Sequence, residues 1–355
     1  MGSVPFAVGA FSKLFLRYGC RNVRVEGLPA FLQHLESDRG VLTLANHVSV
    51  ADISFCGIMG WPLGSVDEPF MWGSLPLRNF LNPKTLRWTL GASDMMFNVR
   101  PSVASEAKRS ANPPAKLLPY SLRSSDAQGK LDSWFFTKGQ VIETFRGKGI
   151  YQKAIDVATQ KLEEGNWVRC GLPGDGLTEL MPLHAQVHIF PEGRIKQEDL
   201  HNLRRFKWGI SRMLMECERL PLIVPVWIKG TFFYILHSTA LVSESLEASG
   251  FEQVMDEPRV WPNFAPRLNK DVTILFGDPI NSAVEPHLAK YHKRFPEGWR
   301  PADHERSVEL DLEEEPRELA RMRSEMAKVM RRELMRLGER VEEVEKRPPG
   351  PLAGW

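Results

Sequence analysis

Near its N-terminus the chain reads Gly40-Val41-Leu42-Thr43-Leu44-Ala45-Asn46-His47. A short apolar run with β-branched residues is typical of a buried strand, and the polar pair at its end stops the strand. Residues 49–59 are largely apolar, with Asp52 near their start, and they predict a helix. A strand, a polar turn and a helix in this order indicate an α/β arrangement.

Strands and helices alternate in this way over roughly 250 residues of the chain. Apolar runs predict strands at 23–26, 134–136, 187–190, 222–227 and 272–276, and helical patterns lie at 29–36, 152–164 and 206–218. We therefore predict an α/β fold, with a central mixed sheet flanked by helices and a charged helix at the C-terminal end.

Composition excludes several classes of protein. The 355 residues include 46 Lys and Arg against 44 Asp and Glu, so the net charge of +2 gives no basic field of the kind that marks a general nucleic-acid binder. No nucleic-acid partner is expected. The 4 cysteines lie far apart in the sequence, which excludes a compact zinc module and a disulfide framework.

Three segments differ from the predicted core. Residues 99–130 are rich in Ser, Pro, Ala and Lys and predict a mobile insertion. A second insertion, 169–186, contains a Gly-rich loop, and a plain turn is favoured over a phosphate-binding loop because no Gly-Lys-Ser/Thr follows. In the tail, 301–355, apolar residues recur mostly every three or four positions, which predicts a helix packed on the body or, alternatively, one that binds a partner. The chain is thus divided into an N-terminal segment 1–22, a core domain 23–300 and the tail.

The N-terminal segment is predicted to associate with a membrane surface without crossing it. Val4–Leu16 is almost entirely apolar and basic residues follow it, which suits a monotopic interfacial anchor; the alternative is a buried N-terminal helix. In a second apolar segment, Leu220–Leu236, residues 222–227 are favoured as a core strand, so the aromatic cluster Phe232–Tyr234 is the better candidate for membrane contact. Neither segment has the run of about 18 apolar residues that a standard transmembrane helix needs.

The turn after the first buried strand carries a candidate catalytic pair. Asp52 follows His47 by five residues, at the start of the predicted helix. A carboxylate that reaches the imidazole can fix its tautomer and stabilise the imidazolium that forms when the histidine accepts a proton. Such a histidine can act as a general base toward a substrate hydroxyl. Taken alone, the pair also fits an ordinary surface or capping pair.

A second polar cluster, Phe190-Pro191-Glu192-Gly193-Arg194, directly follows a predicted strand. The carboxyl ends of strands are where open α/β sheets bind ligands. There Arg194 would bind a phosphate and Glu192 a glycerol hydroxyl; the alternative is a solvated turn. Arg146 follows another strand end, and its planar guanidinium suits a phosphoester.

Four blocks in this order resemble the glycerophospholipid acyltransferase family. They are the pair His47 and Asp52, the strand end with Arg146, the turn Phe190–Gly193, and the apolar stretch Ile223-Val224-Pro225-Val226. Any one block is weak, whereas four in order are specific. Within that family, residues 87–89, 145–153 and 205–210 resemble the tafazzin subfamily. The resemblance covers roughly residues 5–285.

The resemblance implies a CoA-independent transacylase that moves an acyl chain from a phospholipid to a lysophospholipid and remodels cardiolipin in mitochondria, on the outer or inner membrane facing the intermembrane space. His47 would be the general base, oriented by Asp52, while Asn46, Arg146 and the cluster Phe190–Arg194 would bind the lipid headgroup. No metal or other cofactor is expected, because one ester is broken while a like one is made. The alternatives are an acyl-CoA-dependent 1-acylglycerol-3-phosphate acyltransferase and, in another class, a non-catalytic lipid-binding membrane protein.

Overall fold

The computed structural model describes residues 3–47, 71–81, 86–97, 133–164, 186–193, 202–230, 269–300 and 316–347. Several predicted features lie outside these residues: Asp52 with its helix 49–59, Arg194, the insertion 99–130, all of the insertion 169–186 except Gln186, and Phe232–Tyr234.

A seven-stranded sheet forms the centre of the molecule, with the strand order β1-β7-β6-β2-β5-β3-β4. The strands are β1 (Cys20–Glu26), β2 (Val41–Ala45), β3 (Arg87–Ala92), β4 (Val141–Thr144), β5 (Gln186–Ile189), β6 (Leu222–Gly230) and β7 (Lys270–Phe276). From β6 through β2, β5 and β3 to β4 all neighbours are parallel, whereas β7 runs antiparallel to β6 and pairs in parallel with β1. The predicted α/β fold with a mixed sheet is confirmed.

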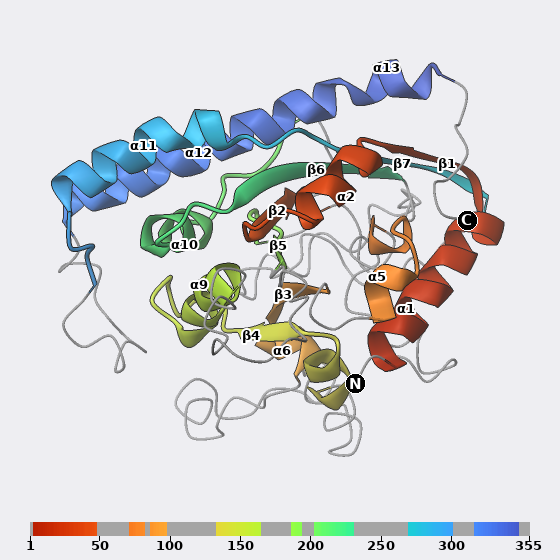
Figure 1. Ribbon diagram of the computed structural model, residues 1–355, viewed down its shortest axis with the longest axis horizontal. Helices are drawn as coiled ribbons and strands as arrows, with labels where there is room; N and C mark the ends of the chain where they lie inside the picture. Colours follow the sequence, from red (N-terminus) through yellow and green to blue (C-terminus); the bar gives the residue numbers. More distant parts are fainter. Residues whose placement is uncertain are drawn as a thin grey trace, which may run out of the picture.

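Helices cover both faces of the sheet (Figure 1). Because side chains along a strand point alternately to the two faces, each strand contributes residues to two cores. Leu42 and Leu44 of β2 belong to a core shared with α9 (Lys153–Glu164), α10 (Gly209–Glu216), α11 (Asn281–Arg294) and α12 (Arg317–Glu339). Val41 and Ala45 of the same strand belong to a second core, shared with α2 (Leu28–Leu35) and with residues 71–80. The shorter helical elements are α5 (Arg78–Leu81), α6 (Ser93–Met96), α13 (Val341–Glu345) and the π-helix η1 (Phe15–Gly19).

Most predicted elements lie within a few residues of their expected ends. The prediction of a strand at 134–136 is wrong. Residues 133–138 are helical, with the Thr137 hydroxyl donating to the Ser133 carbonyl and the Gly139 amide to the Phe135 carbonyl. Consecutive aromatic residues favour strands when two faces are covered. Here Phe136 is buried and Trp134 is 51% exposed, so the segment has one apolar side and forms a helical turn.

The charged C-terminal helix packs on the body of the protein, as predicted. Leu319, Met326, Met330 and Leu334 of α12 are fully buried in the first core. Figure 1 shows α12 lying alongside α11 across one side of the molecule. The apolar stripe of the tail is therefore part of the hydrophobic core.

The N-terminal segment forms the helix α1 (Ser3–Leu14), which continues into η1. Lys13 is buried, and its ammonium donates hydrogen bonds to the carbonyls of Gly73 at 3.5 Å and Leu75 at 3.0 Å, while burial lowers its pKa. On the other side Leu14 is 57% and Tyr18 76% exposed. No helix in the described part of the chain is long and apolar enough to cross a membrane.

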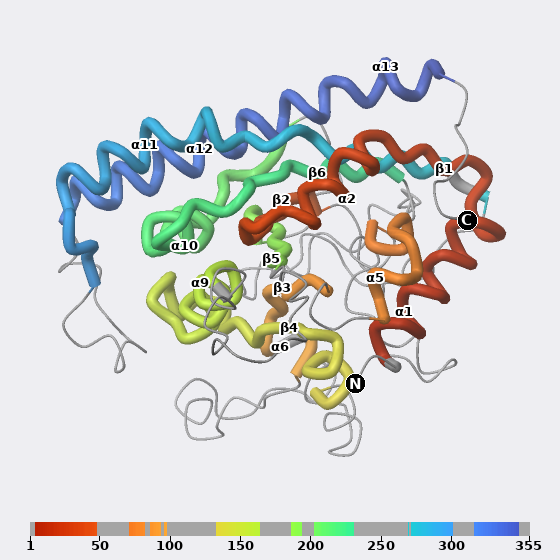
Figure 2. The backbone as a smooth tube through the Cα atoms, in the orientation of Figure 1, coloured from red at the N-terminus to blue at the C-terminus, as the bar shows by residue number. Residues whose placement is uncertain are grey.

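Distant parts of the sequence meet at one edge of the sheet. Figure 2 shows β1, near the N-terminus, running beside β7. Cys20 is paired with Lys270 in this ladder, and the Arg21 guanidinium binds the Asp271 carboxylate through two hydrogen bonds of 2.9 and 2.7 Å. Hydrogen bonds from the side chains of Arg21 and Asn22 hold the pKa of the Asp271 carboxyl down at about 2, and burial acts against them only in part.

Candidate active site

One edge of the sheet collects the predicted site residues that the structure describes. The strands β2, β5 and β4 are all parallel in direction, so their carboxyl ends meet at the same edge. His47 lies two residues beyond β2, the turn Phe190–Gly193 follows β5, and Arg146 lies two residues beyond β4. Ligands bind at this edge in open α/β sheets, which is the location that the sequence predicts.

His47 is held from its backbone and from its ring. Its backbone N–H donates to Oε1 of Glu192 at 3.3 Å. Its imidazole stacks on the ring of Phe190, with the centroids 4.2 Å apart and the planes 18° from parallel. The histidine itself is half-buried. Its ring is thus oriented by the turn that follows β5, while part of it faces solvent at the edge of the sheet.

Asn46 fixes the backbone immediately before this histidine. Its side chain is buried, its Oδ1 accepts from the Ile228 N–H at 2.8 Å, and its Nδ2 donates to the Ile228 carbonyl at 2.8 Å. The amide therefore continues the pairing of β2 with β6 by one further residue. Asn46 was predicted to bind substrate; in the structure its amide binds the backbone of β6, which places His47.

Glu192 joins three segments at the edge of the sheet. Its side chain is 2% exposed, and Oε2 accepts from the backbone N–H of Arg204 at 2.7 Å while Oε1 accepts from that of His47. Backbone N–H groups that donate to a buried carboxylate form strong, charge-assisted hydrogen bonds. The Pro191 carbonyl adds a bond from the Lys207 N–H at 2.8 Å. The carboxylate thus ties β2, β5 and residues 204–207 together.

Gly193 completes this turn. Its N–H donates to the Phe190 carbonyl at 3.1 Å, and its φ of +67° lies in the left-handed region that favours glycine. A Cβ at this position would also approach the Lys207 side chain to 3.2 Å. The turn therefore needs glycine for its backbone conformation.

Sequence reasoning assigned no role to His188, which lies beneath the site. Its Nδ1 is 2.8 Å from Oγ1 of Thr43, and its ring packs edge-on against Phe190. Burial, together with the positive charges of Arg87 and His47, lowers its pKa well below the usual value. Its Nε2 has no hydrogen-bond partner among the described residues. The sequence gives one hint of this role, because His188 is a polar residue between Val187 and Ile189 in a predicted buried strand.

Arg146 lies on an exposed loop between β4 and α9. The side chain of Gln152 closes this loop, since its Oε1 accepts from the Phe145 N–H at 2.8 Å and its Nε2 donates to the Gly149 carbonyl at 2.7 Å. Gly147 and Gly149 have φ values of +79° and +70°. The arginine is therefore presented by a short, internally bonded loop at the same edge of the sheet as His47.

A family model described as acyltransferase matches residues 118–229. This part of the chain is similar to acyltransferases. The matched region includes Arg146 and the turn Phe190–Gly193, and it begins after His47. The role of His47 therefore does not follow from this match and depends on the geometry of the edge.

Similar proteins extend the likeness beyond the acyltransferase domain. The chain is 28% identical to a tafazzin of Dictyostelium discoideum over 63% of this chain and 57% of the relative. It is 28% identical to a tafazzin of Saccharomyces cerevisiae over 80% of this chain and 62% of the relative. It is also 25% identical to an N-acylphosphatidylethanolamine synthase of Arabidopsis thaliana, over 80% and 73%. The chain thus spans about three fifths of the length of these two tafazzins.

Proposed function

We propose that this protein is a phospholipid–lysophospholipid transacylase that works without CoA and remodels cardiolipin. The observation that carries the proposal is the placement of His47. Its imidazole lies half-buried at the carboxyl edge of the sheet, stacked on Phe190, with its backbone N–H bonded to Glu192. A histidine held in this way and still reachable from solvent suits a general base.

The proposed reaction has two steps. His47 takes the proton from the free hydroxyl of the lysolipid as that oxygen attacks the ester carbonyl of the donor phospholipid. The tetrahedral intermediate then collapses, the donor's glycerol oxygen leaves, and the imidazolium returns the proton to it. Asp52 would orient the ring and stabilise the imidazolium between the two steps. One ester is broken and one is formed, so the exchange balances without an energy source.

The arginines would bind the headgroup of the acceptor. Arg146 follows β4, which is three strands away from β2, so the two strand ends are roughly 14 Å apart. At that separation Arg146 is better placed for a phosphate at some distance from the reacting hydroxyl than for one directly beside it. It suits a second phosphate on an extended headgroup, such as that of monolysocardiolipin, and Arg194 would bind the nearer one.

The lipid substrates require the site to face a membrane surface. We propose monotopic attachment through α1 and η1, where the exposed side chains of Leu14 and Tyr18 would enter the headgroup layer, with Phe232–Tyr234 as a second contact. Cardiolipin remodelling would place the protein on a mitochondrial membrane facing the intermembrane space. The similarity to tafazzins supports the association with a membrane.

Two other acyl-transfer reactions are the main competitors. An acyl-CoA-dependent 1-acylglycerol-3-phosphate acyltransferase would use the same acyltransferase domain. The similarity to an N-acylphosphatidylethanolamine synthase favours an amine acceptor as a further candidate. In another class, a lipid-binding membrane protein would need none of this chemistry.

A single assay separates these candidates. Purified protein is incubated with vesicles of phosphatidylcholine carrying a radiolabelled acyl chain, together with monolysocardiolipin, lysophosphatidate or phosphatidylethanolamine, each with and without unlabelled acyl-CoA. We expect label in cardiolipin without acyl-CoA, and none with His47→Ala. Label in N-acylphosphatidylethanolamine alone would indicate N-acylation. Unlabelled acylated product that forms only with acyl-CoA, followed by mass spectrometry, would indicate a CoA enzyme, and no product with any acceptor would exclude an acyltransferase.

A further inference from the structure

The loop that carries Arg146 is attached to the body by two buried arginines from other helices. Nη1 of Arg212, on α10, donates to the Ile150 carbonyl at 2.7 Å. Nη2 of Arg323, on α12, donates to the Tyr151 hydroxyl at 2.7 Å. The Arg212 guanidinium also lies 4.9 Å from the centre of the Tyr151 ring. Both contacts fall on the two residues at which the loop ends.

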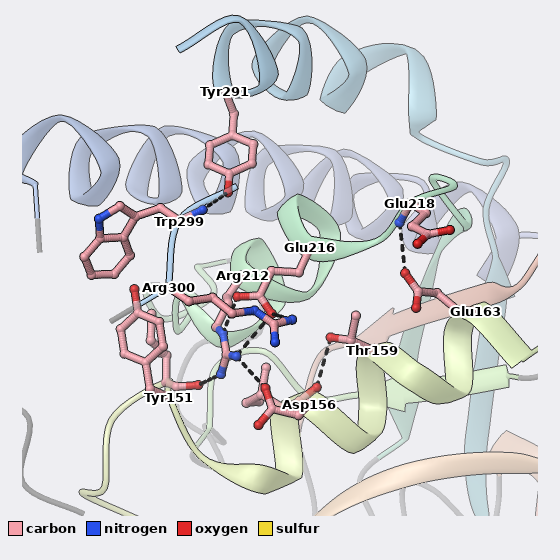
Figure 3. Close-up of polar contacts among 12 residues, drawn as sticks. Tyr151, Asp156, Thr159, Glu163, Arg212, Glu216, Glu218, Tyr291, Trp299 and Arg300 are labelled. Carbon is pink, nitrogen blue, oxygen red and sulfur yellow. Dashed lines mark hydrogen bonds and ion pairs between the residues drawn. The ribbon is translucent and has the colours of Figure 1, made fainter. Parts of the chain in front are cut away.

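Figure 3 shows how Arg212 is held. Its guanidinium bonds to the carboxylates of Asp156 and Glu216, and Glu216 is bonded in turn by Arg300 at 3.1 Å. Tyr151 lies beside Arg212 and packs against Trp299, with the ring centroids 5.8 Å apart. These contacts fix the position of the guanidinium that holds the Ile150 carbonyl.

Burying two guanidinium groups is costly, and apolar side chains of similar size pack helices equally well. The side chain of Arg212 is fully buried and that of Arg323 is 2% exposed. Arg323 is further joined to α10, because the Ser211 hydroxyl donates to its carbonyl at 2.9 Å. Two charges at this place are therefore better explained by what they hold in position than by the packing of α10 on α12.

The two arginines hold the loop between β4 and α9, which has little conformational freedom. Gln152 bonds to both Phe145 and Gly149, so the loop is closed between the end of β4 and the start of α9. Once Ile150 and Tyr151 are fixed to the body, the backbone at Arg146 is fixed with them. A pre-positioned cation binds a phosphate with less loss of entropy than one on a free loop.

We infer that Arg323 of the C-terminal helix is a positioning residue for Arg146, acting through the Tyr151 hydroxyl and assisted by Arg212. The helix α12 thereby becomes part of the substrate-binding apparatus as well as part of the core. The inference rests on the proposed function in one respect, that Arg146 binds a phosphate of the acceptor lipid.

The test uses the full chain and measures the loop and the enzyme separately. The variants are Arg323→Lys, Tyr151→Phe and their combination. Arg336→Lys is the matched control, since Arg336 lies on the same helix, is exposed, and pairs with Glu333 of that helix. Trypsin cuts after Arg146 and Lys148, both of which are exposed, and mass spectrometry follows cleavage at these two bonds under native conditions. Steady-state kinetics gives the KM for monolysocardiolipin and kcat.

We expect trypsin to cleave the loop about tenfold faster in Arg323→Lys and in Tyr151→Phe. Each variant loses the buried hydrogen bond between the guanidinium and the Tyr151 hydroxyl, so the loop detaches from the body more often. The double variant should be cleaved no faster than the faster single variant, since both changes remove one shared bond. The KM for the lysolipid should rise about three- to tenfold with kcat nearly unchanged, and Arg336→Lys should behave as wild type.

The cleavage rate and the KM test two different statements. Unchanged cleavage in Tyr151→Phe, the mildest variant, would overturn the positioning role whatever the kinetics show. Faster cleavage with an unchanged KM would confirm that Arg323 holds the loop and would remove Arg146 from headgroup binding, so the failure would then lie in the proposed function. If Arg323→Lys does not fold, Tyr151→Phe alone decides the question.

Discussion

His47 is the residue on which the proposed chemistry depends most directly. We expect His47→Ala to fold normally, because its ring is only half-buried, and to lower transacylase turnover by at least about 100-fold, the scale of a lost general base. Asp52→Ala should act in the same direction. The exposed His292 of α11 provides the control, and His292→Ala should retain full activity. Near wild-type turnover in His47→Ala would rule out the mechanism.

Glu192 offers a second test at this scale, because its carboxylate accepts hydrogen bonds from two backbone N–H groups. In Glu192→Gln one side-chain oxygen becomes an NH₂ group, so either His47 or Arg204 faces a donor instead of an acceptor. We expect the free energy of unfolding to fall by about 1–3 kcal/mol and kcat to fall more than KM rises.

Urea denaturation and steady-state kinetics on the same samples measure both effects. Glu325→Gln, at an exposed position on α12, is the control. A large rise in KM with kcat preserved would instead indicate that Glu192 binds the lipid itself, as the sequence suggested.

His188 makes stability depend on pH. Its pKa is lowered in the folded protein by burial and by the charges of Arg87 and His47, whereas the unfolded chain binds a proton at its usual pKa of about 6.5. As the pH falls below that value, the unfolded state takes up the proton first, so the folded state loses up to about 1.4 kcal/mol per pH unit.

Urea denaturation between pH 7.5 and 5 measures this dependence. We expect a shallower decline in His188→Asn, and an unchanged one in His292→Asn. Equal slopes for the wild type and His188→Asn would show that another group carries the effect.

The sequence predicted which residues meet at the site better than what they do there. His47, Arg146 and Phe190–Gly193 could be brought together from the sequence, because each follows a strand and parallel strands end at one edge. The partners of Asn46 and Glu192 could not be found in this way. They are backbone groups of Ile228, His47 and Arg204, and only the register of β2 against β6 and the path of residues 202–208 bring them near.

At the scale of elements, helices and strands were predicted correctly where their apolar residues form an uninterrupted or regular pattern. β2 and β6 are continuous apolar runs and were found, whereas β3 was missed because Arg87, Thr89 and Gly91 interrupt it. Trp134–Phe136 was misassigned because its composition favours a strand while only one of its sides is covered. α11 was missed as well, since its apolar positions are few and charged residues surround them.

The helix α12 carries a prediction of its own. Leu334 is fully buried between the sheet and the neighbouring helices, so Leu334→Ala should lower the free energy of unfolding by about 2–5 kcal/mol. Arg332→Ala, on the exposed side of the same helix, should change it by less than about 0.5 kcal/mol. Thermal or urea denaturation measures both, and equal effects would show that α12 does not contribute its apolar side to the core in solution.

At the scale of the whole molecule, attachment to a membrane is the open test. If α1 inserts through apolar side chains, a wash with 1 M salt, which shortens the Debye length to about 3 Å, should leave the protein on vesicles, whereas detergent should release it. The double variant Leu14→Ser, Tyr18→Ser should bind vesicles more weakly in a flotation assay, because these side chains are 57% and 76% exposed. Release by salt alone would indicate electrostatic binding instead.

The pairing of β1 with β7 has a consequence for synthesis on the ribosome. The strand β1 pairs with β7, whose residues follow it by about 250 positions and, at ~5–20 residues per second, are translated roughly 10–50 s later. Throughout that interval β1 and the apolar helix before it have emerged without their partner strand. We therefore expect a chaperone or a lipid surface to cover these residues until β7 is translated, because transiently exposed apolar segments and unpaired strands are prone to aggregate.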